Sequence, residues 1–340
     1  MGVAHGLGGC RDGKVAPSEP VTSSAAGGAA LAAATKADGA GGAAGAAAAA
    51  KAAPFVPREP PEAWATWPMP NAQLPGLANP QSYDTTSNRL VVTDLVTNLM
   101  WQRDVENTFV PFDDAQRACA ALRLIGHDDW RLPSRIELIS LLDMARTQPS
   151  INTEAFPNAP PEWFWTSTTA SDDPTSAWYV YFYAGYPKTD SKGNRFSYRC
   201  VRSVTPRVHP ATHYEVLPYR VRDLWTGLTW QRAVLDKQVP LTVARDYCAH
   251  LKLGGKSGGK TGEKHGWRLP TEGELFTLVD ESATRSPRID AAAFPDTPGE
   301  PFWSSSYFAN GPAMSWYVAF DNGDGRYVFP IEKHRVRCVQ

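Results

Sequence analysis

The sequence Trp130-Arg131-Leu132-Pro133-Ser134-Arg135-Ile136-Glu137-Leu138 occurs a second time, with changes, as Trp267-Arg268-Leu269-Pro270-Thr271-Glu272-Gly273-Glu274-Leu275. In each copy a hydroxyl residue stands three positions before a glutamate, which is the spacing of a helix capping box. The preceding proline favours an extended backbone, and apolar residues recur at helical spacing after it. Each copy therefore predicts a strand that ends at the proline, followed by a short amphipathic helix.

The tryptophan, arginine and glutamate of this unit fit a structural role or a binding role. The structural interpretation makes the tryptophans core residues, the glutamates helix caps, and the arginines buried partners of a carboxylate or carbonyl group. The residues concerned are Trp130, Arg131, Glu137, Trp267, Arg268 and Glu274. The alternative is that the three residue types together form a site.

The similarity continues on both sides of the unit, so the chain is a tandem repeat. Residues 91–103 match 221–232 and predict a β-hairpin. Asp113 and Thr242 fall at equivalent positions and are the expected N-caps of the next helix. The second copy gains eight residues within 254–262, which predicts a surface loop. Strand-like runs follow at 164–167, 178–180 and 199–201, and again at 302–305, 316–318 and 337–339. Each copy therefore predicts an α+β domain with helices segregated from antiparallel strands.

Composition divides the 340 residues into a leader and two domains. Residues 1–80 are rich in Ala, Gly and Pro and predict a flexible tether, from which Trp64 and Trp67 are expected to dock on the first domain. The domains are expected at 82–204 and 213–340, with a linker at 205–212. A net charge of −1 excludes recruitment of nucleic acid by an overall field. Twelve tryptophans and twelve tyrosines fit either bulky core side chains or a sugar-stacking surface.

The cysteines indicate the compartment. Cys119 and Cys200 of the first copy match Cys248 and Cys338 of the second, which predicts one disulfide in each domain and an oxidising environment. Leu7-Gly8-Gly9-Cys10 resembles the lipobox of bacterial lipoproteins, in which Cys10 would carry the lipid that attaches the protein to an outer leaflet. Residues 1–9 show no signal peptide. We expect either that the reading frame begins too late or that the tetrapeptide occurs by chance.

The repeated motifs resemble a known family. Asp129 to Leu138, with Leu99-Met100-Trp101-Gln102 upstream and Arg199-Cys200-Val201-Arg202 at the end, is similar to the C-terminal domain family of the bacterial collagen-like adhesin Lcl. The likeness covers 82–204 and 213–340. It implies a C-type-lectin-like fold and non-catalytic recognition of a polysaccharide or of a surface protein in the cell envelope.

An enzyme and a purely structural envelope module are the alternatives. Arg-Leu-Pro-Thr-x-x-Glu alone also resembles the formylglycine-generating, sulfatase-modifying enzymes, which implies a reactive thiol. The sequence contains no His-x-Glu-x-x-His pattern, phosphate-binding glycine loop or Gly-x-Ser-x-Gly motif. Non-catalytic recognition is therefore expected, with no cofactor and no nucleic acid.

Two groups of residues are candidates for ligands. Asp321, Asn322 and Asp324 could coordinate calcium, but the same residues suit a tight turn between strands. Sugar-binding C-type lectins use a Glu-Pro-Asn triplet for calcium, which this sequence lacks. The second group is basic and aromatic and could bind a sulfated or otherwise acidic glycan, or could line solvated edge strands. It consists of Lys188, Lys192, Arg195, Tyr198, Arg326, Tyr327, Lys333 and Arg335.

Overall fold

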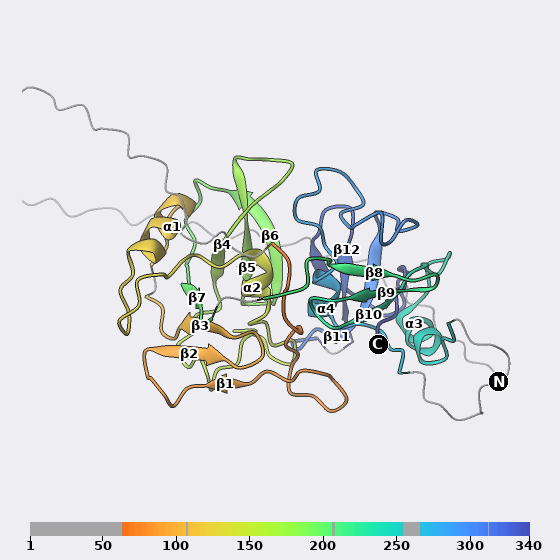
Figure 1. Ribbon diagram of the computed structural model, residues 1–340, viewed down its shortest axis with the longest axis horizontal. Helices are drawn as coiled ribbons and strands as arrows, with labels where there is room; N and C mark the ends of the chain where they lie inside the picture. The colour runs from red at the N-terminus through yellow and green to blue at the C-terminus, as the bar shows by residue number, and fades with distance from the viewer. Residues whose placement is uncertain (1–62, 107, 206–207, 254–265, 312) are drawn as a thin grey trace, which may run out of the picture. The chain divides into compact units, whose positions relative to one another are not determined.

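The computed structural model describes residues 63–340 apart from 107, 206–207, 254–265 and 312 (Figure 1). The proposed lipid anchor at Cys10, the tether up to residue 62 and the loop inserted within 254–262 lie outside the described residues. In the described part, strands predominate and helices are few, which confirms the α+β class.

The two repeats have the same order of elements except for the last strand, β7, which has no counterpart among the described strands of the second repeat. The first contains β1 (Tyr83–Asp84), β2 (Val91–Asp94), β3 (Leu99–Gln102), α1 (Phe112–Ala121), α2 (Arg135–Ile139), β4 (Trp163–Thr169), β5 (Ser176–Tyr181), β6 (Tyr186–Ser191) and β7 (Val201–Ser203). The second contains β8 (Tyr214–Val216), β9 (Arg220–Asp223), β10 (Thr229–Gln231), α3 (Leu241–Ala249), α4 (Glu272–Phe276), β11 (Pro301–Tyr307), β12 (Ser315–Ala319) and β13 (Gly325–Val328).

The strands form two antiparallel sheets in each repeat. Strands β1-β2-β3-β7 and β4-β5-β6 form those of the first, and β8-β9-β10 and β11-β12-β13 those of the second. In the second repeat Val339 bridges to Trp230 and Arg268, in the place that β7 takes in the first. The hairpins predicted at the start of each copy are therefore β2-β3 and β9-β10.

The helices that carry the first cysteine of each repeat begin earlier than predicted. Helix α1 follows Pro111, whose extended backbone (φ −61°, ψ 159°) forms the N-cap without a side-chain hydrogen bond. Pro240 has the same role before α3. The expected caps Asp113 and Thr242 therefore lie inside the helices, and that prediction is wrong. Proline is suited to a helix start because its missing N–H would be unpaired there.

The segment before the first repeat is packed rather than free. Ala65, Trp67 and Met69 are each 1% exposed, and the Trp64 ring lies 5.0 Å from that of His213 in the second repeat. This packing corrects the expected flexible tether for residues 65–72. Trp64, which was expected to dock on the first domain, lies against His213 of the second. The cause is ordinary burial of large apolar side chains, which outweighs the extended preference of the proline-rich composition.

The two repeats share one apolar core. A continuous cluster of buried side chains includes Trp67 of the leading segment, Trp101 of the first repeat and Trp230 of the second. Seven tryptophans are among the largest fully buried side chains, which favours core packing over sugar stacking for most of them. The repeats are therefore joined by packing as well as by the chain.

The junction between the repeats, called the seam here, is approximately reciprocal. Trp178 of the first repeat lies against Gly323 of the second. Trp316, at the equivalent position of the second repeat, is in an apolar cluster with Ala184 and faces Tyr186 at 6.2 Å. Contacts that recur in exchanged order are those expected for two similar units related by an approximate two-fold axis.

Arg135 at the start of α2 is one polar link across the seam, and Arg288, which pairs with Asp172 at 2.6 Å, is another. Arg135 is 1% exposed, donates to the Gly323 carbonyl oxygen and lies 3.5 Å from the Glu281 carboxylate. Its guanidinium also stacks 4.0 Å from the centroid of Trp178. Burial raises the pKa of Glu281 to about 7, and nearby Arg135 opposes that rise.

Candidate functional site

The repeated Trp-Arg-Leu-Pro units are structural centres of the two repeats. Arg131 and Val201 exchange main-chain hydrogen bonds of 2.9 Å, which places this short segment beside the last strand of the repeat. Arg131 donates two bonds of 2.7 Å to Glu137. Glu137 also accepts from the Ser134 main-chain N–H and completes a capping box. Because Arg131 and Glu137 already satisfy one another, they have little capacity for a ligand.

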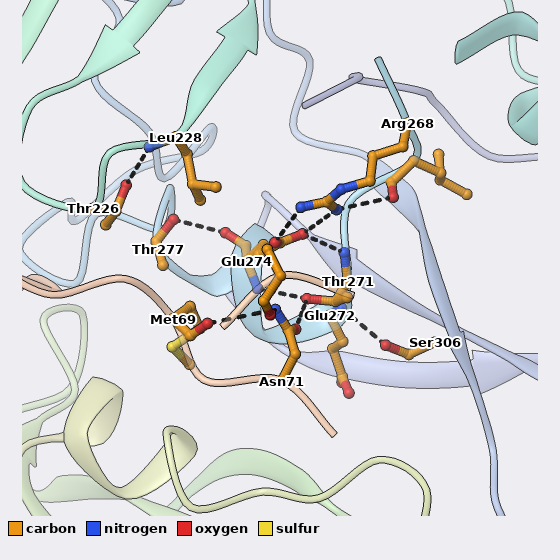
Figure 2. Close-up of polar contacts among 12 residues, drawn as sticks. Met69, Asn71, Thr226, Leu228, Arg268, Thr271, Glu272, Glu274, Thr277 and Ser306 are labelled. Carbon is orange, nitrogen blue, oxygen red and sulfur yellow. Dashed lines mark hydrogen bonds and ion pairs between the residues drawn. The ribbon is translucent and has the colours of Figure 1, made fainter. Parts of the chain in front are cut away.

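The second unit has the same arrangement and an additional partner. Figure 2 shows Arg268 paired with Glu274, at 2.6 Å and 2.7 Å, and Glu274 capping the helix that begins after Thr271. The Thr271 hydroxyl donates to Asn71 Oδ1 at 2.7 Å. The leading segment is thereby fixed to the second repeat by a polar contact at its capping box. Trp130 and Trp267 are buried, at 2% and 8% exposure.

Both predicted disulfides are present. Cys119 is bonded to Cys200 and Cys248 to Cys338, with sequence separations of 81 and 90. Cys119 on α1 is thereby joined to the residue before β7, and Cys248 on α3 to the residue before Val339, which bridges to Trp230 and Arg268. These four cysteines consequently supply no thiolate for the sulfatase-modifying alternative.

Three of the eight predicted ligand residues gather in one hollow. This seam hollow, of about 300 Å³, is lined by Tyr186, Pro187, Lys188, Asp324, Gly325, Arg326 and Tyr327. Lys188 on β6 and Arg326 on β13 are exposed and come from different repeats, and their strands contact one another. In Figure 1, β6 lies at the side of its sheet that faces the second repeat.

The charges of the seam hollow are mainly positive. Arg326 approaches Asp324 at 3.5 Å, a long contact. Burial raises the pKa of Asp324, against the effects of Arg135, Arg326 and Lys188. Two exposed cations and one largely buried carboxylate leave a net positive hollow that can receive an anion.

Aromatic side chains give the seam hollow a rigid wall. The ring of Tyr327 stacks on Phe308 at 4.1 Å and meets the edge of Trp316 at 5.0 Å. Tyr186 is half-buried nearby, and burial raises its pKa. Fixed aromatic rings beside cations are a combination that suits charged sugars, because a sugar ring packs on the aromatic face while its anionic groups meet the cations.

The other five predicted ligand residues do not join this hollow. Lys192 donates to the Pro174 carbonyl oxygen at 2.9 Å and lies over the ring of Phe112. Arg335 is engaged by Glu300 at 2.6 Å and by the Asp236 carbonyl oxygen at 2.6 Å. Tyr198 packs against the apolar cluster around the first disulfide. Arg195 and Lys333 are exposed elsewhere.

Residues 320–324 form the turn between β12 and β13, and this turn contains Asp321, Asn322 and Asp324. Asn322 Oδ1 accepts from the main-chain N–H of Asp324, and Asn322 Nδ2 donates to the Asp324 carboxylate at 3.1 Å. Among the described residues there is no group of three or more His, Cys, Asp or Glu side chains able to hold a metal ion. These contacts are those of the tight turn, the second interpretation of this motif.

Two features of the site were missed from the sequence. The first is the docking that brings Lys188 and Arg326 together. The two residues are separated by 138 positions, which is the offset that relates the late strands of the two copies, so their equivalence alone was visible in the sequence. The second is a larger cavity on another side of the seam, which involves Glu272.

Comparison with known proteins agrees with the repeated architecture. The sequence model of the Lcl C-terminal domain matches residues 90–202 and again residues 219–340. A comparison with curated proteins gave no match. In the described part of the chain no helix has the length and apolar character needed to cross a membrane. Since the two matches cover most of the sequence and coincide with the two repeats, the chain belongs to the Lcl C-terminal domain family, whose members are adhesin-type modules.

Proposed function

We propose that this protein is a non-catalytic adhesion module of the cell envelope that binds an acidic polysaccharide in the seam hollow. The observation that carries the proposal is the convergence of Lys188 and Arg326, which occupy equivalent positions of the two repeats. The stacked ring of Tyr327 beside them supports a sugar rather than an isolated anion. The lectin-like relation implied by the sequence resemblance is consistent with this choice.

The proposal assigns one composite site to the chain. Each repeat alone would present a single cation on an edge strand, whereas the seam presents two on neighbouring strands. A polymer with regularly spaced sulfate or carboxylate groups can engage both cations at once. The arginine can bind such a group through a two-pronged pair of hydrogen bonds, and the lysine acts as a point charge. Avidity from two separate sites is not required.

An extracytoplasmic location is part of the proposal. Two disulfides that close long loops are typical of proteins from oxidising compartments. Attachment through a lipid on Cys10 remains a prediction from the sequence.

Heparin, as a sulfated polysaccharide probe, tests the proposal by titration calorimetry. Lys188→Gln and Arg326→Gln are each expected to weaken binding about tenfold, since a charge-assisted hydrogen bond contributes about 1.5–3 kcal/mol. The matched controls Lys237→Gln and Arg220→Gln remove exposed charges outside the hollow and should change affinity less than about twofold.

Salt and a neutral polymer complete the test. Affinity for heparin should fall as salt rises from about 50 to about 200 mM, and neutral dextran should not compete. Equal losses in the four variants would reject the seam hollow as the site. Absence of binding to any member of an acidic glycan array would reject the function and favour a structural envelope module or a protein partner.

A further inference from the structure

A second cavity lies where the leading segment and the two repeats meet. Its volume is about 530 Å³, and it is separate from the seam hollow in its lining residues. Apolar side chains from all three parts line it, among them Leu74, Ile139, Met144, Phe276 and Phe308. A mainly apolar cavity of this size is typical of small-molecule sites.

One acidic side chain in the cavity lining has unused bonding capacity. Glu272 is 1% exposed, and neither carboxyl oxygen has a hydrogen-bond partner among the described residues. Its main-chain N–H donates to the hydroxyl of Ser306 at 3.1 Å. Figure 2 shows the Glu272 carboxyl group directed away from the Arg268, Glu274 and Thr271 network. An unpaired carboxyl group in an apolar setting is costly, so proteins rarely keep one without a use.

The other charged residues of the lining do not neutralise Glu272. Arg268 is paired with Glu274. Arg245 donates to the Tyr307 hydroxyl and to the Ser305 carbonyl oxygen, and its guanidinium stacks over the Tyr307 ring. Burial alone raises the pKa of Glu272, with no charged neighbour contributing to the shift. Burial therefore favours the neutral form of this carboxyl group.

Comparison of the repeats shows which partner is missing. Glu272 is the equivalent of Arg135, and Met144 is the equivalent of Glu281, at the offset that relates the two capping boxes. On one side of the seam, Arg135 and Glu281 form an ion pair. On the other side the acid Glu272 takes the place of the cation Arg135, and the apolar Met144 takes the place of the acid Glu281, so this pair of positions has an acid without a cation. Both residues line the cavity.

We propose that this cavity binds an amphiphilic amine, whose ammonium group pairs with Glu272 and whose apolar chain lies against Met144, Phe276 and Phe308. The ligand supplies the cation that the second half of the seam lacks. On binding, Glu272 gives up its proton to solvent and becomes a carboxylate, while the amine stays protonated.

Octylamine and octanol are the paired probes, because they share a chain and differ in the charged head. Calorimetry on the full chain is expected to show octylamine bound at least about tenfold more tightly than octanol. Titrations in two buffers of different ionisation enthalpy should show release of about one proton per octylamine at a pH below the shifted pKa of Glu272. Equal affinity for the two probes, or no binding of either, would overturn the proposal.

Variants locate the interaction. Glu272→Gln keeps the shape of the side chain and should lower octylamine affinity about tenfold, abolish proton release and leave octanol binding unchanged. The exposed control Glu332→Gln should change none of these values. Met144→Lys should place an internal ammonium beside Glu272 and prevent octylamine binding. Unchanged octylamine binding in Glu272→Gln or Met144→Lys would refute the assignment. Heparin binding should persist in both variants, because the seam hollow is a different site.

Discussion

Replacement of Arg135 by methionine tests whether the seam is a structural core rather than a loose contact between domains. The substitution keeps an unbranched apolar stem but removes the guanidinium. That group donates to Gly323, approaches Glu281 at 3.5 Å and stacks 4.0 Å from the Trp178 centroid. Glu281, whose side chain is 5% exposed in the native structure, then loses its cation.

The expected magnitude follows from this burial. Removing one partner of a buried ion pair costs about 3–5 kcal/mol, and the lost stacking on Trp178 adds up to about 2 kcal/mol. An apolar stem recovers part of this, so we expect Arg135→Met to lower the free energy of unfolding by about 3–4 kcal/mol at pH 8. The loss should be smaller at pH 5, where Glu281, with a pKa of about 7, is protonated and needs no cation.

Urea denaturation followed by tryptophan fluorescence measures the change in the free energy of unfolding. Urea is uncharged, whereas guanidinium chloride would screen the charges of the ion pair. The double variant Arg135→Met with Glu281→Gln should recover about 1–3 kcal/mol at pH 8, because the stranded charge is gone. Arg117→Met is the matched control, since its ion pair with Asp114 is 58% and 48% exposed and should contribute less than about 1 kcal/mol. A loss in Arg135→Met as small as that of the control, or one independent of pH, would refute the role assigned to the seam.

Three further predictions concern stability. Joint replacement of Cys119 and Cys200 by alanine opens a loop with a sequence separation of 81 and should lower the free energy of unfolding by up to about 4–5 kcal/mol. We expect a lower urea midpoint without reductant, and an unchanged midpoint would contradict this prediction. Glu281 has a higher pKa in the folded than in the unfolded protein. Its contribution to the free energy of unfolding is therefore fully present below about pH 4.5 and is lost as the pH rises through about 7. The free energy of unfolding of the wild type, relative to that of Glu281→Gln, should therefore fall over that pH range. A difference between the two proteins that does not change with pH would count against this prediction. Trp67→Ala should destabilise by about 3–5 kcal/mol if the leading segment belongs to the core, whereas a free tether would show no change in thermal unfolding.

The sequence was sufficient for features that depend on local spacing. Ser134 and Glu137 stand at capping-box distance, and the structure contains that box in both repeats. The disulfides also followed, because the cysteines lie at matching places of two similar copies. The start of α1 did not follow, since both Pro111 and Asp113 suit a helix start and only the backbone decides between them.

Features that depend on docking were predicted only in part. Trp67 was expected to dock on the first domain, but its place in one cluster with side chains of both repeats depends on residues far along the chain. Lys188 and Arg326 were among eight basic or aromatic candidates, and only the seam separates them from Lys192 and Arg335, whose groups are engaged locally. The change from Arg135 to Glu272 at equivalent positions was a visible signal, but its meaning required the cavity.

The central claim is that docking of the two repeats creates the polysaccharide site. Chemical-shift mapping of the labelled protein with a short heparin oligosaccharide tests it most directly. We expect saturable shifts of the main-chain amides at 186, 188 and 324–327, from both repeats at the same ligand concentration. Shifts confined to one repeat, or centred on Arg195 and Lys333 instead, would contradict it.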